Sequence, residues 1–142
     1  MKPALIALAA MFLPLTGFAD EPPKLGEFSL SLTVKDLKAS RDFYEKLGFT
    51  ALKAEEIGPG LHKYGERWLI LKNSSVIIGL FQGAFDRNIM TFHPADVRAL
   101  QKALKQRGLK FANEADEKTK GLGSAMLLDP DGNPILLDQI VP

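Results

Sequence analysis

Apolar and polar residues alternate without interruption over residues 28–34. The apolar positions are Phe28, Leu30, Leu32 and Val34. The positions between them carry hydroxyl groups and are Ser29, Ser31 and Thr33. Because successive side chains of a strand point to opposite faces, this pattern predicts a strand with one face in a core and the other face against something polar.

A helix is predicted directly after this strand. Asp36 is placed to cap its first turn, and Gly48 can end it in the left-handed conformation. The apolar residues at helical spacing are Leu37, Phe43, Tyr44 and Leu47. Three strands are expected next, at residues 49–52, 68–71 and 76–81, the last two forming a hairpin. The order of these elements is a βαβββ unit.

The same order recurs about 60 residues later. A strand is predicted at residues 89–93 and a closing hairpin at residues 125–137, with a helix between them that begins after Asp96 and ends at Gly108. A shift of 60 residues superposes Asp36 on Asp96. For the closing hairpins the shift is nearer 57.

The repeat predicts one α+β domain. Two βαβββ units, at roughly residues 27–83 and 87–140, are expected to form a curved mixed sheet around a shared cleft. One helix covers only one face of a four-stranded sheet, so pairing the units lets the uncovered faces meet.

These features resemble a known family. The strand and helix at residues 28–49, the internal repeat and the hairpin at residues 127–135 are similar to the vicinal oxygen chelate superfamily, which includes glyoxalase I, extradiol dioxygenases and bleomycin-resistance proteins. The resemblance covers residues 27–140, and it implies a glyoxalase-like domain at residues 27–142.

The resemblance also implies where a metal ion would be held. Metal-dependent relatives use one residue from the first strand and one from the last strand of each repeat, typically His and Glu. Those positions are Ser29, Gly79, Ile89 and Leu136 here, or Asn88 in place of Ile89 if the second repeat is shifted by one residue. None carries an imidazole or a carboxylate, so a divergent member without metal or other cofactor is expected.

Two histidines leave alternatives open. His93 shares strand parity with Thr91, and Asp138 shares it with Leu136, so His93 and Asp138 could form a non-standard metal site. The competing interpretations are a histidine at the rim of the cleft and a solvated carboxylate at a strand end. His62 lies in a Gly- and Pro-rich link that either folds over the cleft or stays an exposed loop.

The expected cleft is mostly apolar, with a few hydroxyl groups. Its candidate ligand-binding residues are Ser29, Ser31, Thr33, Trp68, Ile77, Gly79, Phe81, Thr91, His93, Met126 and Leu136. This composition suits a small organic molecule. The alternative is that the large side chains fill the space, because strand parity cannot separate a lined cavity from a packed core.

Residues 1–19 have the pattern of a secretory signal peptide. Lys2 precedes an apolar run at residues 4–15 and the small-residue site Gly17–Phe18–Ala19. A membrane anchor is the alternative, but the run is shorter than the ~20 residues that a spanning helix needs. The mature chain is therefore expected in the periplasm or outside the cell, not in a membrane, with residues 20–26 as a flexible lead-in that adds no side chain to the core.

The charge balance and the absence of Cys limit the classes of partner and chemistry that this chain can have. Removing residues 1–19 from the 142-residue chain leaves 123 residues, enough for one domain, with 17 basic and 17 acidic residues. Such a balance offers no electrostatic surface for nucleic acid. The absence of Cys excludes disulfides, thiolate metal sites and a thiol nucleophile.

Three functions are consistent with these features. The first is an exported, metal-free module that binds a small molecule. The second is a metal-dependent enzyme of glyoxalase, lyase or dioxygenase type with non-standard ligands, and the third is an interaction protein with a vestigial cleft. A homodimer is expected in addition, on the argument that apolar residues 76–78 and 135–137 lie at sheet edges that a second copy would cover.

Overall fold

A computed structural model describes residues 21–58 and 61–140, and the expected signal peptide lies outside these residues. The first repeat contains β1 (Glu27–Val34), α1 (Leu37–Lys46), β2 (Thr50–Ala51), α2 (Ala54–Ile57), β3 (Trp68–Lys72) and β4 (Ile77–Gln82). The second contains β5 (Ile89–His93), α3 (Val97–Gln106), β6 (Phe111–Asn113), β7 (Gly123–Leu128) and β8 (Pro134–Gln139). Apart from the short α2, each repeat is a βαβββ unit, so the predicted α+β architecture is confirmed.

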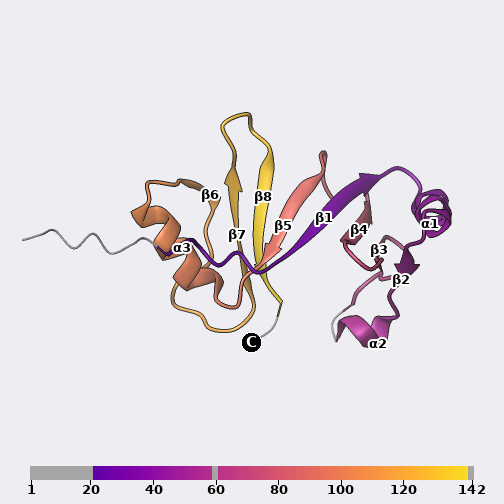
Figure 1. Ribbon diagram of the computed structural model, residues 1–142, viewed down its shortest axis with the longest axis horizontal. Coiled ribbons are helices and arrows are strands. Elements are labelled where there is room, and N and C mark those ends of the chain that lie inside the picture. The colour runs from indigo at the N-terminus through magenta and orange to yellow at the C-terminus, as the bar shows by residue number, and fades with distance from the viewer. Residues whose placement is uncertain (1–20, 59–60, 141–142) are drawn as a thin grey trace, which may run out of the picture.

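All strands belong to one curved, unclosed sheet (Figure 1). The strand order is β2-β3-β4-β1-β5-β8-β7-β6. Within each repeat the first and last strands pair in parallel, β1 with β4 and β5 with β8. The antiparallel pair of β1 and β5 joins the two repeats at the centre of the sheet.

The position of β4 and β8 corrects one prediction. Residues 76–78 and 135–137 were expected at sheet edges, but β4 lies between β3 and β1, and β8 lies between β5 and β7. The edges are β2 and β6, which have two and three residues. Strands this short expose little unpaired backbone. The edge argument for a homodimer is therefore wrong, while the homodimer itself stays a prediction.

Each helix packs on its own half of the sheet, and both lie on the same face. Leu37 of α1 joins a buried cluster with Leu69, Leu71, Ile78 and Leu80. Val97, Leu100 and Leu104 of α3 join a second cluster with Ala115, Ala125, Leu127 and Leu137. In the part of the chain that the structure describes, no helix has the length and apolar character to cross a bilayer.

Two expectations about these cores are wrong. Phe43 and Leu47 were predicted to share one apolar stripe with Leu37 and Tyr44, yet they are 58% and 59% exposed, whereas Leu37 is buried and Ser40 and Tyr44 are half-buried. Leu25, in the lead-in that was expected to contribute nothing, is half-buried and packs against the second cluster.

Both predicted helix boundaries are confirmed. The Asp36 carboxylate accepts a hydrogen bond from the Ala39 N–H at 2.9 Å, and the Asp96 carboxylate caps α3 in the same way. Gly48 and Gly108 follow the two helices with φ of +92° and +86°. These are left-handed conformations that a residue with a Cβ rarely adopts.

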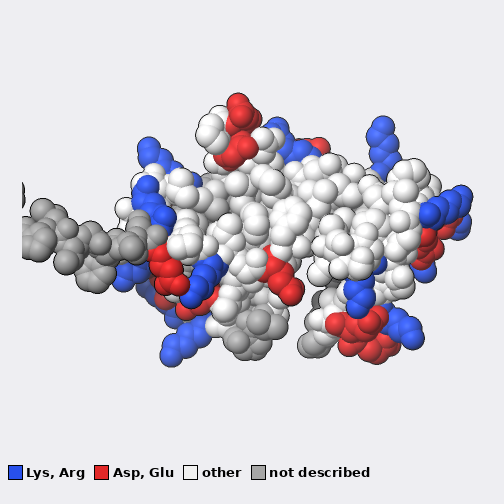
Figure 2. Space-filling model, in the orientation of Figure 1, with Lys and Arg blue, Asp and Glu red and all other residues white. Residues whose placement is uncertain are grey.

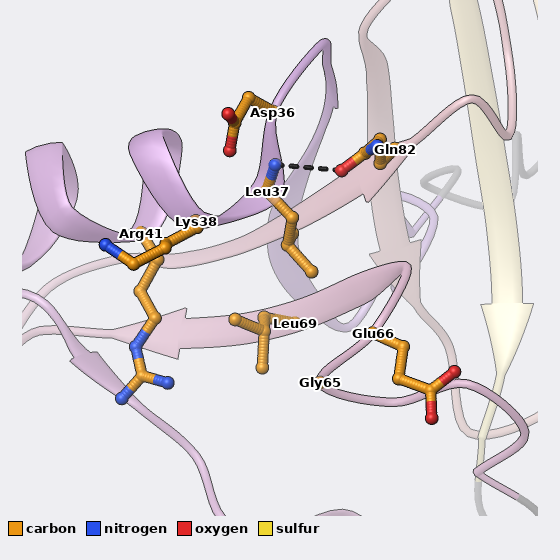
Figure 3. A pocket seen from close by; sticks show the side chains of 8 residues that line it. All are labelled: Asp36, Leu37, Lys38, Arg41, Gly65, Glu66, Leu69 and Gln82. Atoms are coloured by element: carbon orange, nitrogen blue, oxygen red, sulfur yellow. Dashed lines mark hydrogen bonds between the residues drawn. The ribbon is translucent and has the colours of Figure 1, made fainter.

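A second pair of caps was not predicted. The Leu37 N–H at the start of α1 donates a hydrogen bond to Gln82 Oε1 at 2.9 Å (Figure 3). The Val97 N–H at the start of α3 donates to Gln139 Oε1 at 3.1 Å. Gln82 and Gln139 are the last residues of β4 and β8, so the last strand of each repeat holds the first turn of that repeat's helix.

Two side chains of α3 hold the segment that leads into β7. Gln101 is completely buried, accepts a hydrogen bond from the Ala115 N–H at 2.8 Å and donates to the Ala115 carbonyl at 3.2 Å. The Arg98 guanidinium donates to three carbonyl oxygens, those of Asp116, Gly121 and Leu122, and to the Thr119 hydroxyl. The segment is therefore fixed by side chains instead of by a regular element.

Candidate functional site

Strand register places all eleven predicted cleft residues on one face of the sheet. Ser29 lies opposite Ile77 of β4 and Thr91 of β5, and the other candidates follow at alternate positions of β1, β3, β4, β5, β7 and β8. We call this face, opposite α1 and α3, the Ser29 face. The predicted cleft residues on it are Ser29, Ser31, Thr33, Trp68, Ile77, Gly79, Phe81, Thr91, His93, Met126 and Leu136.

His93 bridges the two repeats on this face. Its Nε2 lies 3.0 Å from Ser29 Oγ, and its Nδ1 lies 3.0 Å from the carbonyl oxygen of Asp138. A carbonyl oxygen can only accept, so Nδ1 carries the proton of the neutral ring. Nε2 is then the acceptor, and the Ser29 hydroxyl donates its proton to it.

The Asp138 carboxylate shares the Ser29 face by strand parity. It is half-buried rather than solvated, which corrects the expectation for this strand end. Burial raises the pKa of the carboxyl, and the nearby His93 partly offsets that rise. Within residues 21–58 and 61–140 no side chain forms a hydrogen bond or ion pair with this carboxylate.

Hydroxyl groups continue along the centre of the face. Ser31 Oγ and Thr91 Oγ1 are 3.3 Å apart, so one of the two hydroxyls donates to the other. The Thr33 hydroxyl donates to the Phe85 carbonyl at 2.8 Å, and the Thr33 N–H donates to Asn88 Oδ1 at 3.1 Å. We call the row of Ser29, Ser31, Thr33 and Thr91 the hydroxyl line. The loop between β4 and β5 therefore folds back on β1 and covers the hydroxyl line at its Thr33 end.

An aromatic row flanks the hydroxyl line in the first repeat. The rings of Trp68 and Phe81 are stacked, with centroids 5.8 Å apart and planes 6° from parallel. Phe85 and Tyr64 extend the row at either end. Trp68 Nε1 donates to the His62 carbonyl at 2.9 Å, so the backbone of this link supports the row, while the His62 side chain is exposed.

The residues at the four expected metal positions do not fit a divalent ion. Ser29, Gly79, Ile89 and Leu136 all lie on the Ser29 face, but they offer one hydroxyl among them. A Cβ on Gly79 would lie 2.4 Å from Phe81 Cε2, because the Phe81 ring occupies the space above this glycine. Among the described residues, no three His, Asp or Glu side chains are grouped so that they could hold a metal ion.

Three surface pockets, of about 370, 400 and 390 Å³, lie beside the helices. The first is shown in Figure 3, where Asp36 and Arg41 come from the α1 segment and Glu66 from the loop before β3. Neither Ser29 nor Gly79 lines any of the three. In the view of Figure 2, charged side chains gather over the two ends of the molecule and the β7–β8 turn, and the middle is mostly uncharged.

Comparison with known proteins identifies the family. The model of the Glyoxalase/Bleomycin resistance protein/Dioxygenase superfamily matches residues 25–137. The chain therefore belongs to this superfamily, which confirms the resemblance seen in its sequence. A search of the curated proteins finds no match.

Solved structures show the same fold at low identity. A glyoxalase/bleomycin resistance protein/dioxygenase superfamily member from Vibrio splendidus 12B01 is 16% identical, with a TM-score of 0.54, over 80% of this chain and 97% of that one. A hypothetical protein from Bacillus halodurans C-125 is 13% identical, with a TM-score of 0.56, over 80% and 93%. An extradiol ring-cleaving dioxygenase from B. fuscum is 21% identical, with a TM-score of 0.53, and 34% of that longer chain is covered by 84% of this one.

Proposed function

We propose that this chain is an exported module that binds a small, mostly apolar organic molecule on the Ser29 face without a divalent metal ion. The observation that carries the proposal is the composition of that face. A line of hydroxyl groups and one imidazole runs between an aromatic row and the apolar residues Met126 and Leu136. Such a surface can orient an aromatic or amphipathic ligand through few polar contacts.

The metal-dependent alternative receives less support from the same residues. Lewis-acid catalysis in this superfamily fold would require ligands at Ser29, Gly79, Ile89 and Leu136, and these side chains provide one hydroxyl. His93 and Asp138 do not replace them, because His93 Nδ1 is directed at the Asp138 carbonyl oxygen and its Nε2 at Ser29.

A ligand screen in the presence of EDTA tests the proposal. A bound aromatic compound at 100 times its Kd is expected to raise the stability of the folded chain by about 2.7 kcal/mol, seen as a higher melting temperature. Trp68→Ala should weaken that binding at least tenfold, because it removes one ring of the stacked pair. Phe43→Ala, on the exposed side of α1, serves as the matched control and should leave binding unchanged. Hits that require a divalent ion would contradict the proposal.

We also propose that two copies of the chain assemble. In a single chain the sheet is unclosed, and the three pockets described above open elsewhere than at Ser29. A second copy would supply the wall that a single Ser29 face lacks, and a symmetric pair is the commonest assembly.

Light scattering on the mature chain at micromolar concentration is expected to give twice the mass of one 123-residue chain. A mass equal to that of a single chain, with and without ligand, would contradict the dimer and would mean that one Ser29 face binds the ligand by itself.

A further inference from the structure

We propose that Ser29 and His93 form a nucleophile–base pair that hydrolyses small uncharged carboxylic esters. The proposal rests on the proposed binding of a small molecule to the Ser29 face and adds a reaction to it.

The geometry provides the three groups that activate a serine: the hydroxyl, a base that accepts its proton, and a group that orients the base. A nucleophilic hydroxyl needs a base within hydrogen-bond reach, and the base needs a third group that orients it. Ser29 Oγ lies 3.0 Å from His93 Nε2, and the Asp138 carbonyl oxygen holds Nδ1 on the opposite side of the ring. This arrangement fixes the tautomer in which Nε2 is free to take the Ser29 proton. Asp138 is thus a positioning residue, acting through its backbone.

A donor for the developing oxyanion lies next along the face. Thr91 is opposite Ser29 across the β1–β5 pair, and its hydroxyl is 3.3 Å from that of Ser31. The two hydroxyls carry two protons, of which their mutual hydrogen bond uses one. The other proton is available to the carbonyl oxygen of the substrate. Thr91 and Ser29 are 3% and 8% exposed, so that carbonyl group has to reach both hydroxyls at the floor of the face.

The surroundings select the substrate class. Ile77 lies opposite Ser29 on β4, and the stacked Trp68 and Phe81 rings follow further along the same face. These side chains suit an apolar acyl or aryl group. The half-buried Asp138 carboxylate, which forms no ion pair with a Lys or Arg of the described chain, disfavours anionic esters. An uncharged aryl ester therefore fits this face better than a carboxylate or phosphate ester.

The reaction follows from these placements. Ser29 Oγ attacks the ester carbonyl carbon while its proton passes to His93 Nε2, and the imidazolium then gives that proton to the departing alcohol oxygen. The acyl group remains on Ser29. Water, deprotonated by His93, attacks the acyl carbon, and the collapse of that adduct releases the carboxylic acid and returns the proton to Ser29 Oγ.

Two measurements on the mature chain test the proposal. An uncharged fluorophosphonate ester should form a covalent phosphonyl adduct, located at Ser29 by peptide mass spectrometry. With p-nitrophenyl acetate, Ser29→Ala and His93→Gln should each lower the rate of p-nitrophenolate release at least a hundredfold. Ser75→Ala, in the exposed turn between β3 and β4, is the control and should keep the wild-type rate.

The outcomes separate this proposal from the binding proposal. An adduct elsewhere, no adduct, or hydrolysis that persists in Ser29→Ala overturns the nucleophile–base pair. Mapping the adduct needs only the wild-type chain, so a variant that fails to fold leaves the test intact. If the EDTA screen still yields a ligand that Trp68→Ala loses, the Ser29 face binds without this chemistry. If the screen yields none, the binding proposal fails by itself.

Discussion

Replacing Gln101 by leucine is expected to lower the free energy of unfolding by about 3 kcal/mol. The Gln101 side chain is completely buried, and its amide satisfies both the N–H and the carbonyl of Ala115. Leucine has a similar size but no polar atom in its side chain. The N–H and the carbonyl of Ala115, a residue that is 6% exposed, would therefore lose their hydrogen-bond partners. Buried polar groups without a hydrogen bond are among the costliest defects in a folded protein.

Urea denaturation followed by far-UV circular dichroism measures this change. Gln106→Leu is the matched control, because Gln106 is exposed at the end of the same helix. Its effect should stay within about 0.5 kcal/mol, as for most surface substitutions. If Gln101→Leu cost no more than the control, water would be replacing the amide, and the segment into β7 would not depend on it.

Gly79→Ala is expected to cost about 2 kcal/mol of stability, within the range of overpacked cores. The added Cβ would lie 2.4 Å from Phe81 Cε2 and 3.3 Å from Ile70 Cδ1. The Phe81 ring cannot move away freely, since it lies between Trp68 and Phe85. The same contact prevents a metal-binding glutamate at this position without rearrangement of the aromatic row.

A double-mutant cycle isolates the contact. In a Phe81→Ala background the ring atoms near Gly79 are gone, so Gly79→Ala should cost at least about 1 kcal/mol less than in the wild-type chain. Strict additivity of the two substitutions would mean that the ring does not limit position 79. The cause would then lie with Ile70.

The repeat and its boundaries could be predicted because they depend on local chemistry. Alternation along β1, the caps at Asp36 and Asp96, and the glycines after each helix are all visible within a few residues of sequence. The short α2 was missed, and the strand that corresponds to β6 was implied by the repeat but not located, because four or three residues carry no periodicity. The edge assignment of residues 76–78 and 135–137 failed for another reason. Apolar composition shows that a strand is buried but not which strands flank it.

The candidate site could be predicted only as a face. Strand parity assigned Ser29, Thr91 and His93 to the same side of the sheet. Their contacts depend on the register of β1 against β5, in which His93 lies opposite Glu27 while its ring reaches Ser29. That register is a tertiary property without a local signal. The caps at Gln82 and Gln139 did have a signal in the sequence, because the two glutamines are separated by the same 57 residues as the closing hairpins.

Those two glutamines bear on how such a chain could arise and rearrange. Because Gln82 and Gln139 each fasten the helix of their own repeat, neither repeat borrows a helix cap from the other. A gene segment that encodes one repeat would specify both the start of a helix and the strand whose glutamine caps it. Duplication of that segment would therefore copy the helix together with its cap. For the same reason, two chains could exchange whole repeats by opening the β1–β5 pair and releasing the segment before β1 from the second repeat, with every helix cap left in place.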